Sequence, residues 1–234
     1  MAYQLNTNLD TGHWAAEYRH DLRCRVKDLL APSAAADIAQ SLTHHARFRQ
    51  AHIANGEYRE ISREEFSALP PAARQQLVRE VYDMASRGVG FWYGRQGLDS
   101  NTAAPLDKLV SWLNSEPLLE QVREITGIQE LASTSAQATS FSPGDFLTRH
   151  RDDVTSEGRR VAFVLNLTEH WHPDWGGLLQ FFEDSGATRE AWSPEFNSLC
   201  LFDVKHVHSV TTVAPFAPRV RLAISGWFHD RKHN

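Results

Sequence analysis

The chain has 234 residues, of which 41% are hydrophobic and 23% charged, so it is long and apolar enough to bury a large core and is not a disordered protein. Its 24 basic and 29 acidic side chains give a formal net charge of −5, and the basic residues form no block. We therefore expect no nucleic-acid partner.

The N-terminal segment and the cysteines indicate a compartment. Residues 1–14 (MAYQLNTNLDTGHW) lack the basic and then apolar layout of a signal peptide, and no apolar run approaches the roughly 18 residues of a membrane span. Cys24 and Cys200 lie far apart, and Cys200 belongs to an apolar run, which favours buried free thiols over a disulfide. We expect a cytoplasmic protein without a membrane partner.

Residues 1–130 read mainly as helices. Apolar residues recur at helical spacing in Ala34–His45, Ala72–Ser86 and Pro105–Thr126, and a further helix is expected to begin after Ser62. Each of these segments has an apolar face and a charged face, as expected for helices that pack on a core.

From about residue 131 the sequence pattern becomes that of short strands separated by turns. Seven strands are predicted, at Ser135–Phe141, Phe146–His150, Arg160–Leu167, Leu178–Glu183, Ser198–Asp203, His208–Val213 and Arg219–His229. So many short strands in this length favour a jelly roll of two facing antiparallel sheets. The prediction is an α+β protein in which residues 1–130 form a helical support region and residues 131–234 a jelly-roll catalytic core, within one integrated domain.

The C-terminal half carries side chains that suit a metal ion. A strand running through His150 and Asp152 would direct both to one face, and Asp153 would point the other way. A distant histidine completes the set, and His206 and His208 both qualify because they share strand parity. Two imidazoles and one carboxylate on one face of an octahedron are typical of non-haem Fe(II) oxygenases, whereas structural zinc sites are usually closed and tetrahedral.

An arginine close behind this set suits an acidic cosubstrate. Arg219 and Arg221 share strand parity, and the guanidinium of one of them would pair with the distal carboxylate of a 2-oxo acid. Ala223 and Ser225 follow on the same face. Ala223 would leave room beside the acid, and the Ser225 hydroxyl would donate a hydrogen bond.

Five segments of the C-terminal half fit one known pattern: residues 142–152 (SPGDFLTRHRD), 165–166 (LN), 176–179 (GGLL), 208–210 (HSV) and 221–228 (RLAISGWF). In these segments the chain resembles the 2-oxoglutarate/Fe(II)-dependent oxygenases of the prolyl 4-hydroxylase-like group. The H-x-V and R-x-A-I-x-x-W-F patterns of that family select His208 over His206 and Arg221 over Arg219.

The resemblance implies a double-stranded β-helix and a hydroxylase. His150, Asp152 and His208 would bind Fe(II), and Arg221 would bind 2-oxoglutarate, which reacts with O2 to give succinate and carbon dioxide while a C–H bond is hydroxylated. Ascorbate is expected as a supporting reductant. The expected substrate is a prolyl residue or a proline-like compound, presented by a peptide, a protein or a small molecule.

Two alternatives and one departure stay open. The alternatives are hydroxylation of a small molecule or of another amino-acid side chain, and a non-catalytic metal-binding sensor module. The oligomeric state is also open. Many family members bind 2-oxoglutarate with a barrel tyrosine, but all five tyrosines here precede residue 131: Tyr3, Tyr18, Tyr58, Tyr82 and Tyr93. We expect Thr148, Ser140, Asn166 or Ser225 to replace it, or the cosubstrate preference to differ.

Overall fold

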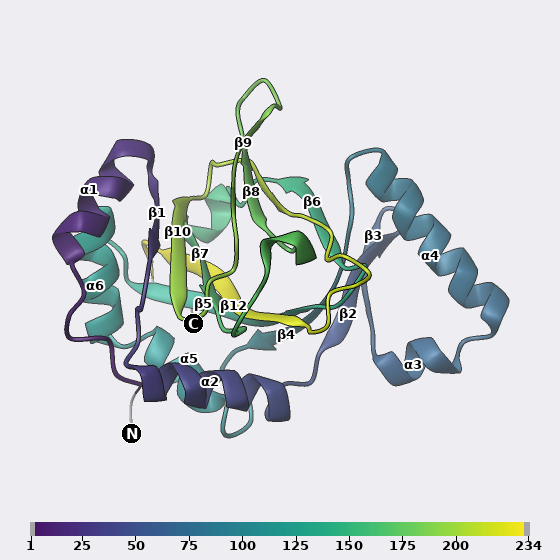
Figure 1. Cartoon of the computed structure of the whole chain (residues 1–234), viewed down its shortest axis with the longest axis horizontal. Coiled ribbons are helices and arrows are strands. Elements are labelled where there is room, and N and C mark those ends of the chain that lie inside the picture. The colour runs from purple at the N-terminus through teal and green to yellow at the C-terminus, as the bar shows by residue number, and fades with distance from the viewer. Residues whose placement is uncertain (1–2, 232–234) are drawn as a thin grey trace.

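The computed structural model describes residues 3–231, except the side chain of residue 155. In this part, one curled antiparallel sheet is flanked by α-helices (Figure 1). The helices are α1 (Thr11–Asp21), α2 (Pro32–His45), α3 (Arg63–Ala68), α4 (Pro71–Ser86), α5 (Asp107–Leu113) and α6 (Glu116–Thr126). The strands are β1 (Arg23–Val26), β2 (Arg49–Ala54), β3 (Glu57–Ile61), β4 (Phe91–Leu98), β5 (Ser133–Phe141), β6 (Phe146–His150), β7 (Arg159–Asn166), β8 (Leu179–Phe182), β9 (Thr188–Trp192), β10 (Ser198–Asp203), β11 (His208–Val210) and β12 (Arg221–His229). The predicted α+β class is confirmed.

The strand order explains how the sheet encloses a space. The order is β1-β10-β7-β12-β5-β4-β6-β11-β8-β9, and the β2–β3 hairpin joins at β4. Along the edge of β4 opposite β2, Phe91 and Trp92 pair with β6, and residues 94–98 pair with β5. The sheet therefore curls at β4, and β6-β11-β8-β9 comes to face the longer half.

Most of the core lies outside this curl, between the longer half of the sheet and the helices. Helices α1, α2, α5 and α6 gather on that side, while α3 and α4 lie beyond β2 and β3 (Figure 1). Ile38 of α2 and Val122 of α6 are fully buried in one cluster with Leu201 and Ile224 of the sheet. Side chains at the alternate positions of β5 and β12 point into the curl, because successive residues of a strand face opposite sides.

The first half contributes more than helices. Strands β1 to β4 precede residue 131 and belong to the same sheet as the later strands. The single helix expected over Pro105–Thr126 is two helices, because Pro117 is tolerated only in the first turn and α6 begins at Glu116. Strand β9 was not predicted, and its first four residues are exposed rather than alternating.

Several local predictions are confirmed. Ser62 caps α3 in a capping box with Glu65, which is the start signal that the sequence carries. Cys24 and Cys200 are buried and free. No helix in residues 3–231 combines the length and the apolar character needed to cross a bilayer.

Candidate metal and cosubstrate site

Three strand ends bring the predicted metal ligands together. His150 is the last residue of β6 and His208 the first of β11, and the two are directly paired across the sheet. Strand β6 ends at His150 and does not run through Asp152, contrary to the prediction from strand parity. The Asp152 amide instead donates to the Val204 carbonyl (3.1 Å), which holds the loop after His150 against the end of β10 and turns the carboxylate inward.

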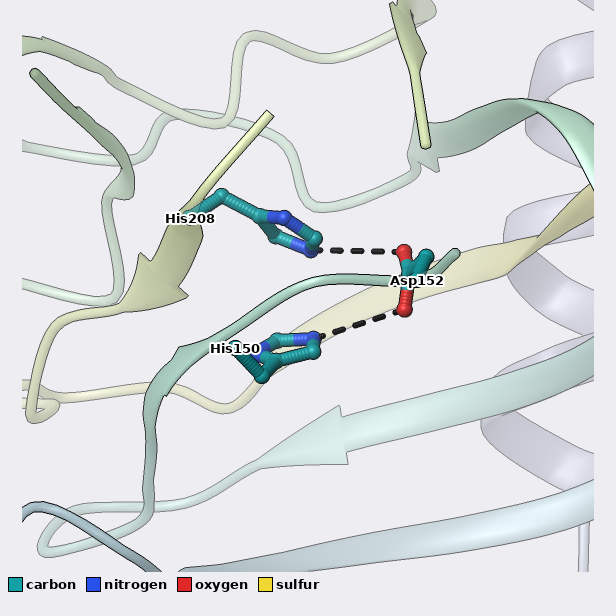
Figure 2. Close-up of side chains that lie close together, drawn as sticks. All are labelled: His150, Asp152 and His208. Carbon is teal, nitrogen blue, oxygen red and sulfur yellow. Dashed lines mark ion pairs between the residues drawn. The ribbon is translucent and has the colours of Figure 1, made fainter. Parts of the chain in front are cut away.

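The three side chains converge on one point. Both imidazole Nε2 atoms face the Asp152 carboxylate, at 3.6 Å for His150 and 3.4 Å for His208 (Figure 2). One ligand atom from each residue lies within 4.8 Å of the other two. Asp152 and His208 are buried and His150 is partly exposed, so the cluster has a protected side and an open side.

The imidazoles are oriented for metal binding. Nδ1 of His150 donates to the Thr148 carbonyl and Nδ1 of His208 to the His206 carbonyl, each over 3.0 Å. A carbonyl oxygen only accepts, so each Nδ1 carries the hydrogen and each Nε2 keeps its lone pair. Burial, and then the neighbouring His150, lower the pKa of His208 to about 4, so this ring is neutral at pH 7. The donor set therefore fits Fe(II).

The structure separates the predicted ligands from their competitors. His206 Nε2 lies 3.0 Å from the Asp21 carbonyl, outside the cluster. Asp153 is exposed. Arg219 is also exposed, lies before β12, and donates to the Glu169 carbonyl at 2.9 Å. Arg221, in contrast, is only 2% exposed and lines the same cavity as the three metal-binding side chains.

Arg221 is a buried cation without a counter-ion. Its Nη2 donates to the Asn166 Oδ1 atom (3.2 Å), its Nε has no hydrogen-bond partner, and its guanidinium lies 5.3 Å from the centre of the Phe141 ring. No carboxylate of residues 3–231 forms an ion pair with it. Burial lowers its pKa to about 10, so it is charged at neutral pH. An unpaired buried charge is costly, and a carboxylate ligand would remove that cost.

The other predicted cosubstrate residues lie in different places. Asn166 supports Arg221, and its amide donates to the Ser198 hydroxyl (3.1 Å). Ser225 lines the cavity and accepts from Gln137 Nε2 (3.2 Å). Thr148 lines a separate depression on the outer side of the sheet, where its hydroxyl accepts from the Gly90 amide (2.9 Å). Ser140 packs against Gly94 rather than toward the cavity.

The expectation that every tyrosine lies outside the barrel is wrong for Tyr93. Strand β4 is part of the curled sheet, and Tyr93 is buried and lines the cavity. Its ring stacks on Phe141 with centroids 4.9 Å apart, beside the guanidinium of Arg221. Burial raises the pKa of Tyr93, so its hydroxyl is protonated at neutral pH. The alternation of Phe91, Tyr93 and Arg95 was the available sequence signal for a strand that faces the site.

The cavity has a volume of about 370 Å³ and holds the metal-binding cluster and Arg221 together. Its walls include Tyr93 and Phe141 of the longer half of the sheet and Leu179 of the shorter half. Apolar walls of this kind strengthen the electrostatic interactions between the charged groups inside.

Comparison with known proteins shows which proteins the region of this site resembles. The model of the 2OG-Fe(II) oxygenase superfamily matches residues 136–229. Prolyl 3-hydroxylase OGFOD1 of Xenopus laevis is 31% identical over 121 residues, which are 49% of this chain and 23% of that protein. The mouse protein of the same name is 31% identical over 113 residues, covering 45% of this chain and 20% of its own length. The chain thus spans about a quarter or less of the curated relatives that it matches.

Solved structures share the fold over nearly the whole chain. A prolyl-4-hydroxylase of Pseudomonas putida has a TM-score of 0.59 at 18% identity and covers 100% of this chain and 97% of its own. A prolyl hydroxylase of Trichoplax adhaerens, in complex with a peptide fragment of hypoxia inducible factor, has a TM-score of 0.63 at 16% identity and covers 94% and 89%. The double-stranded β-helix with N-terminal helices is confirmed.

Proposed function

We propose that this chain is a 2OG-Fe(II) oxygenase, of the superfamily whose model matches residues 136–229, and that it hydroxylates a prolyl residue or a proline-like group. The observation that carries the proposal is the placement, in one cavity, of a His-Asp-His cluster and a fully buried arginine without a counter-ion. Structural metal sites are closed and need no such cation. A site that binds both a metal and a dicarboxylic acid needs a cation to pair with the second carboxylate.

The metal-binding residues and the residues around Arg221 have separate roles. His150, Asp152 and His208 would hold the metal, and Arg221 would hold the distal carboxylate of the cosubstrate in a bidentate pair. When bound, Fe(II) and 2-oxoglutarate supply the oxidising chemistry that inserts one atom of O2 into a C–H bond and leaves succinate and carbon dioxide. Asn166 fixes the direction of Arg221. Tyr93 and Phe141 exclude water beside it.

The substrate follows from similarity. The curated relatives are prolyl 3-hydroxylases, and two of the solved structures are prolyl hydroxylases. This supports a prolyl substrate for the present chain. The partly exposed His150 gives a substrate an approach to the metal from outside.

The test is a search for the product. The purified protein, Fe(II), 2-oxoglutarate and ascorbate are incubated with proline-containing peptides under ¹⁸O2, and the peptides are sequenced by mass spectrometry. We expect hydroxyproline that carries the heavy oxygen, and none with Asp152→Ala. Labelled hydroxyl on another residue type, with proline unmodified, would contradict the prolyl assignment.

A further inference from the structure

A row of polar side chains crosses the cavity away from Arg221. The row consists of Arg95 on β4, Gln137 on β5 and Ser225 on β12, and all three line the cavity of the metal-binding cluster. Arg95 Nε donates to Gln137 Oε1 (2.5 Å), and Gln137 Nε2 donates to the Ser225 hydroxyl oxygen (3.2 Å). Gln137 and Ser225 are direct partners in the β5–β12 register.

The hydrogen bonds of this row can run in only one direction. A guanidinium donates and never accepts, so the oxygen of the Gln137 amide must face Arg95 and its NH2 group must face Ser225. The oxygen of Ser225 then accepts a hydrogen bond, and the hydrogen of the Ser225 hydroxyl is still available for donation. No residue in the range 3–231 accepts from that hydroxyl. The row therefore presents the Ser225 hydrogen to a ligand in the cavity.

The position of the row favours the substrate as that ligand. Ser225 follows Arg221 by four residues, which is roughly 13 Å along a strand. The Arg221 guanidinium stays near Phe141 and Asn166 rather than reaching toward the row. Ser225 shares its end of β12 with Trp227. The Arg159 guanidinium lies over the Trp227 ring, 3.6 Å from its centre. A five-carbon diacid held by Arg221 and the metal ligands does not need the donors at this end.

The charges at this end favour a neutral acceptor. Arg95 already pairs with Glu60 (3.2 Å) and donates to the Tyr58 hydroxyl (2.6 Å), and Arg159 pairs with Glu157 (2.7 Å). Each of these guanidinium groups thus has a carboxylate partner, unlike Arg221. The Arg95 Nη2 group forms no hydrogen bond within residues 3–231, so it is a second free donor beside an already neutralised pair.

We infer that Ser225 and Arg95 are specificity-determining residues that donate hydrogen bonds to an amide carbonyl oxygen of the substrate, with Gln137 as the positioning residue between them. The substrate is then a prolyl group inside a peptide chain and not a free amino acid, whose carboxylate would need an unpaired cation. This inference rests on the proposed prolyl hydroxylation. It goes beyond it by naming the groups that recognise the substrate.

Two variants separate this role from a structural one. Ser225→Ala removes the donor. Gln137→Glu keeps the size of the side chain and the bond from Arg95, but its carboxylate also accepts from Ser225 and captures the hydrogen. The matched control is Ser140→Ala, which removes a serine from the same sheet at a position that packs against Gly94 and faces away from the cavity.

The first measurement is succinate formation as a function of substrate, with N-acetyl-proline amide and free L-proline as probes. We expect N-acetyl-proline amide to be the better substrate of the two, with the lower KM. Ser225→Ala and Gln137→Glu should each raise this KM about tenfold, which is the effect of one lost hydrogen bond. Ser140→Ala should leave this KM unchanged. A preference for free L-proline, or an unchanged KM in both cavity variants, would overturn the inference.

The second measurement is the affinity of the Mn(II)-loaded proteins for 2-oxoglutarate, by calorimetry without turnover. We expect Ser225→Ala and Gln137→Glu to bind it within twofold of the unmodified protein. A tenfold loss would show that Ser225 serves the cosubstrate and would overturn the inference without touching the proposed function. If neither probe stimulates succinate formation in the unmodified protein, the prolyl assignment itself fails, and these affinities still decide which ligand Ser225 serves.

Discussion

At the scale of single residues, Arg221 is the clearest case of a side chain whose surroundings make sense only with a ligand. It is a fully buried guanidinium that has one amide partner and no carboxylate partner within residues 3–231. A buried charge of this kind is unfavourable unless a group of opposite charge pairs with it. A 2-oxo acid with a distal carboxylate fits this requirement, and so does the position of Arg221 beside the metal-binding cluster.

Replacing Arg221 should therefore act on the cosubstrate. We expect Arg221→Gln to weaken 2-oxoglutarate binding by roughly 2–3 kcal/mol, because a charge-assisted pair is lost. The apparent KM for 2-oxoglutarate in a succinate assay measures this. Arg219→Gln is the matched control, since Arg219 is exposed and contacts a loop carbonyl. A larger effect in the control than in Arg221→Gln would reverse the choice of arginine.

The sequence predicts some of these residues and misses others for physical reasons. His150, Asp152 and His208 meet as predicted, although a backbone bond from Asp152 to Val204 replaces the assumed strand parity. The place of Tyr93 beside Arg221 was not predicted, because helices α5 and α6 separate β4 from the barrel strands in the sequence. The alternation at residues 91–95 indicates a strand but not the distant strand with which it pairs. The Arg95–Gln137–Ser225 row was missed for the same reason.

At the scale of secondary-structure elements, strand β12 carries the site and depends on close packing with β5. A Cβ atom added to Gly226 would lie 2.0 Å from the Ser135 carbonyl oxygen and 2.8 Å from the Ala136 Cα atom. Backbone atoms cannot move aside easily, so the two strands would have to separate. The local sequence marks Gly226 only as a weak point in a strand, and the reason for it appears in the three-dimensional packing.

We expect Gly226→Ala to lower the free energy of unfolding by about 3 kcal/mol or more, since overpacking against backbone is among the costliest single changes. Urea denaturation followed by circular dichroism measures the change. Gly97→Ala on β4 is the control, because a Cβ atom there meets nothing within 4 Å. Equal stability of the two variants would show that β5 and β12 are not packed as described.

The turn between β5 and β6 contains a second buried acid, Asp145. Its carboxylate accepts from the Ser142 amide (2.9 Å) and from Gln50 of β2 (3.2 Å), and burial raises its pKa to about 7. The folded state thus favours the protonated form more than the unfolded state does. The resulting stabilisation is fully present below the ordinary pKa of about 4 and is lost as the pH rises through 7.

Comparison with Asp145→Asn isolates this effect, because the variant does not titrate at this position. We expect the free energy of unfolding of the unmodified protein, relative to the variant, to fall by a few kcal/mol at most between pH 5 and pH 8. Urea midpoints at both pH values measure it. A difference that grows with pH would mean that Asp145 is held as a carboxylate.

At the scale of the whole molecule, the number of short strands in the sequence predicts a jelly roll, but it does not predict which strands pair to close the sheet. Seven of the strands were predicted near their observed bounds, and β1, β2 and β3, which precede residue 131, were not. Strand β1 pairs with β10, whose residues lie more than 150 positions later. Such contacts depend on packing of the helices against the sheet, which periodicity in the sequence does not describe.

A bound metal and cosubstrate should stabilise the molecule as a whole, because both bind only to the folded state. At a concentration 100 times Kd a ligand adds about 2.7 kcal/mol, which raises Tm by several degrees in a protein of this size. We expect Mn(II) with 2-oxoglutarate to do so in the unmodified protein and in His206→Ala, but not in His208→Ala. Thermal unfolding of the three proteins measures it, and loss of the shift in His206→Ala alone would exchange the two histidines.

The central claim is that this cavity couples a three-ligand iron site to 2-oxoglutarate turnover. The most direct measurement is the rate of succinate formation from 2-oxoglutarate under O2, with and without Fe(II), in the unmodified protein and in Asp152→Ala. Turnover that requires Fe(II) and falls to background in Asp152→Ala is the predicted result. Succinate formation by Asp152→Ala at the rate of the unmodified protein, or none by the Fe(II)-loaded unmodified protein with any proline-containing peptide, would contradict it.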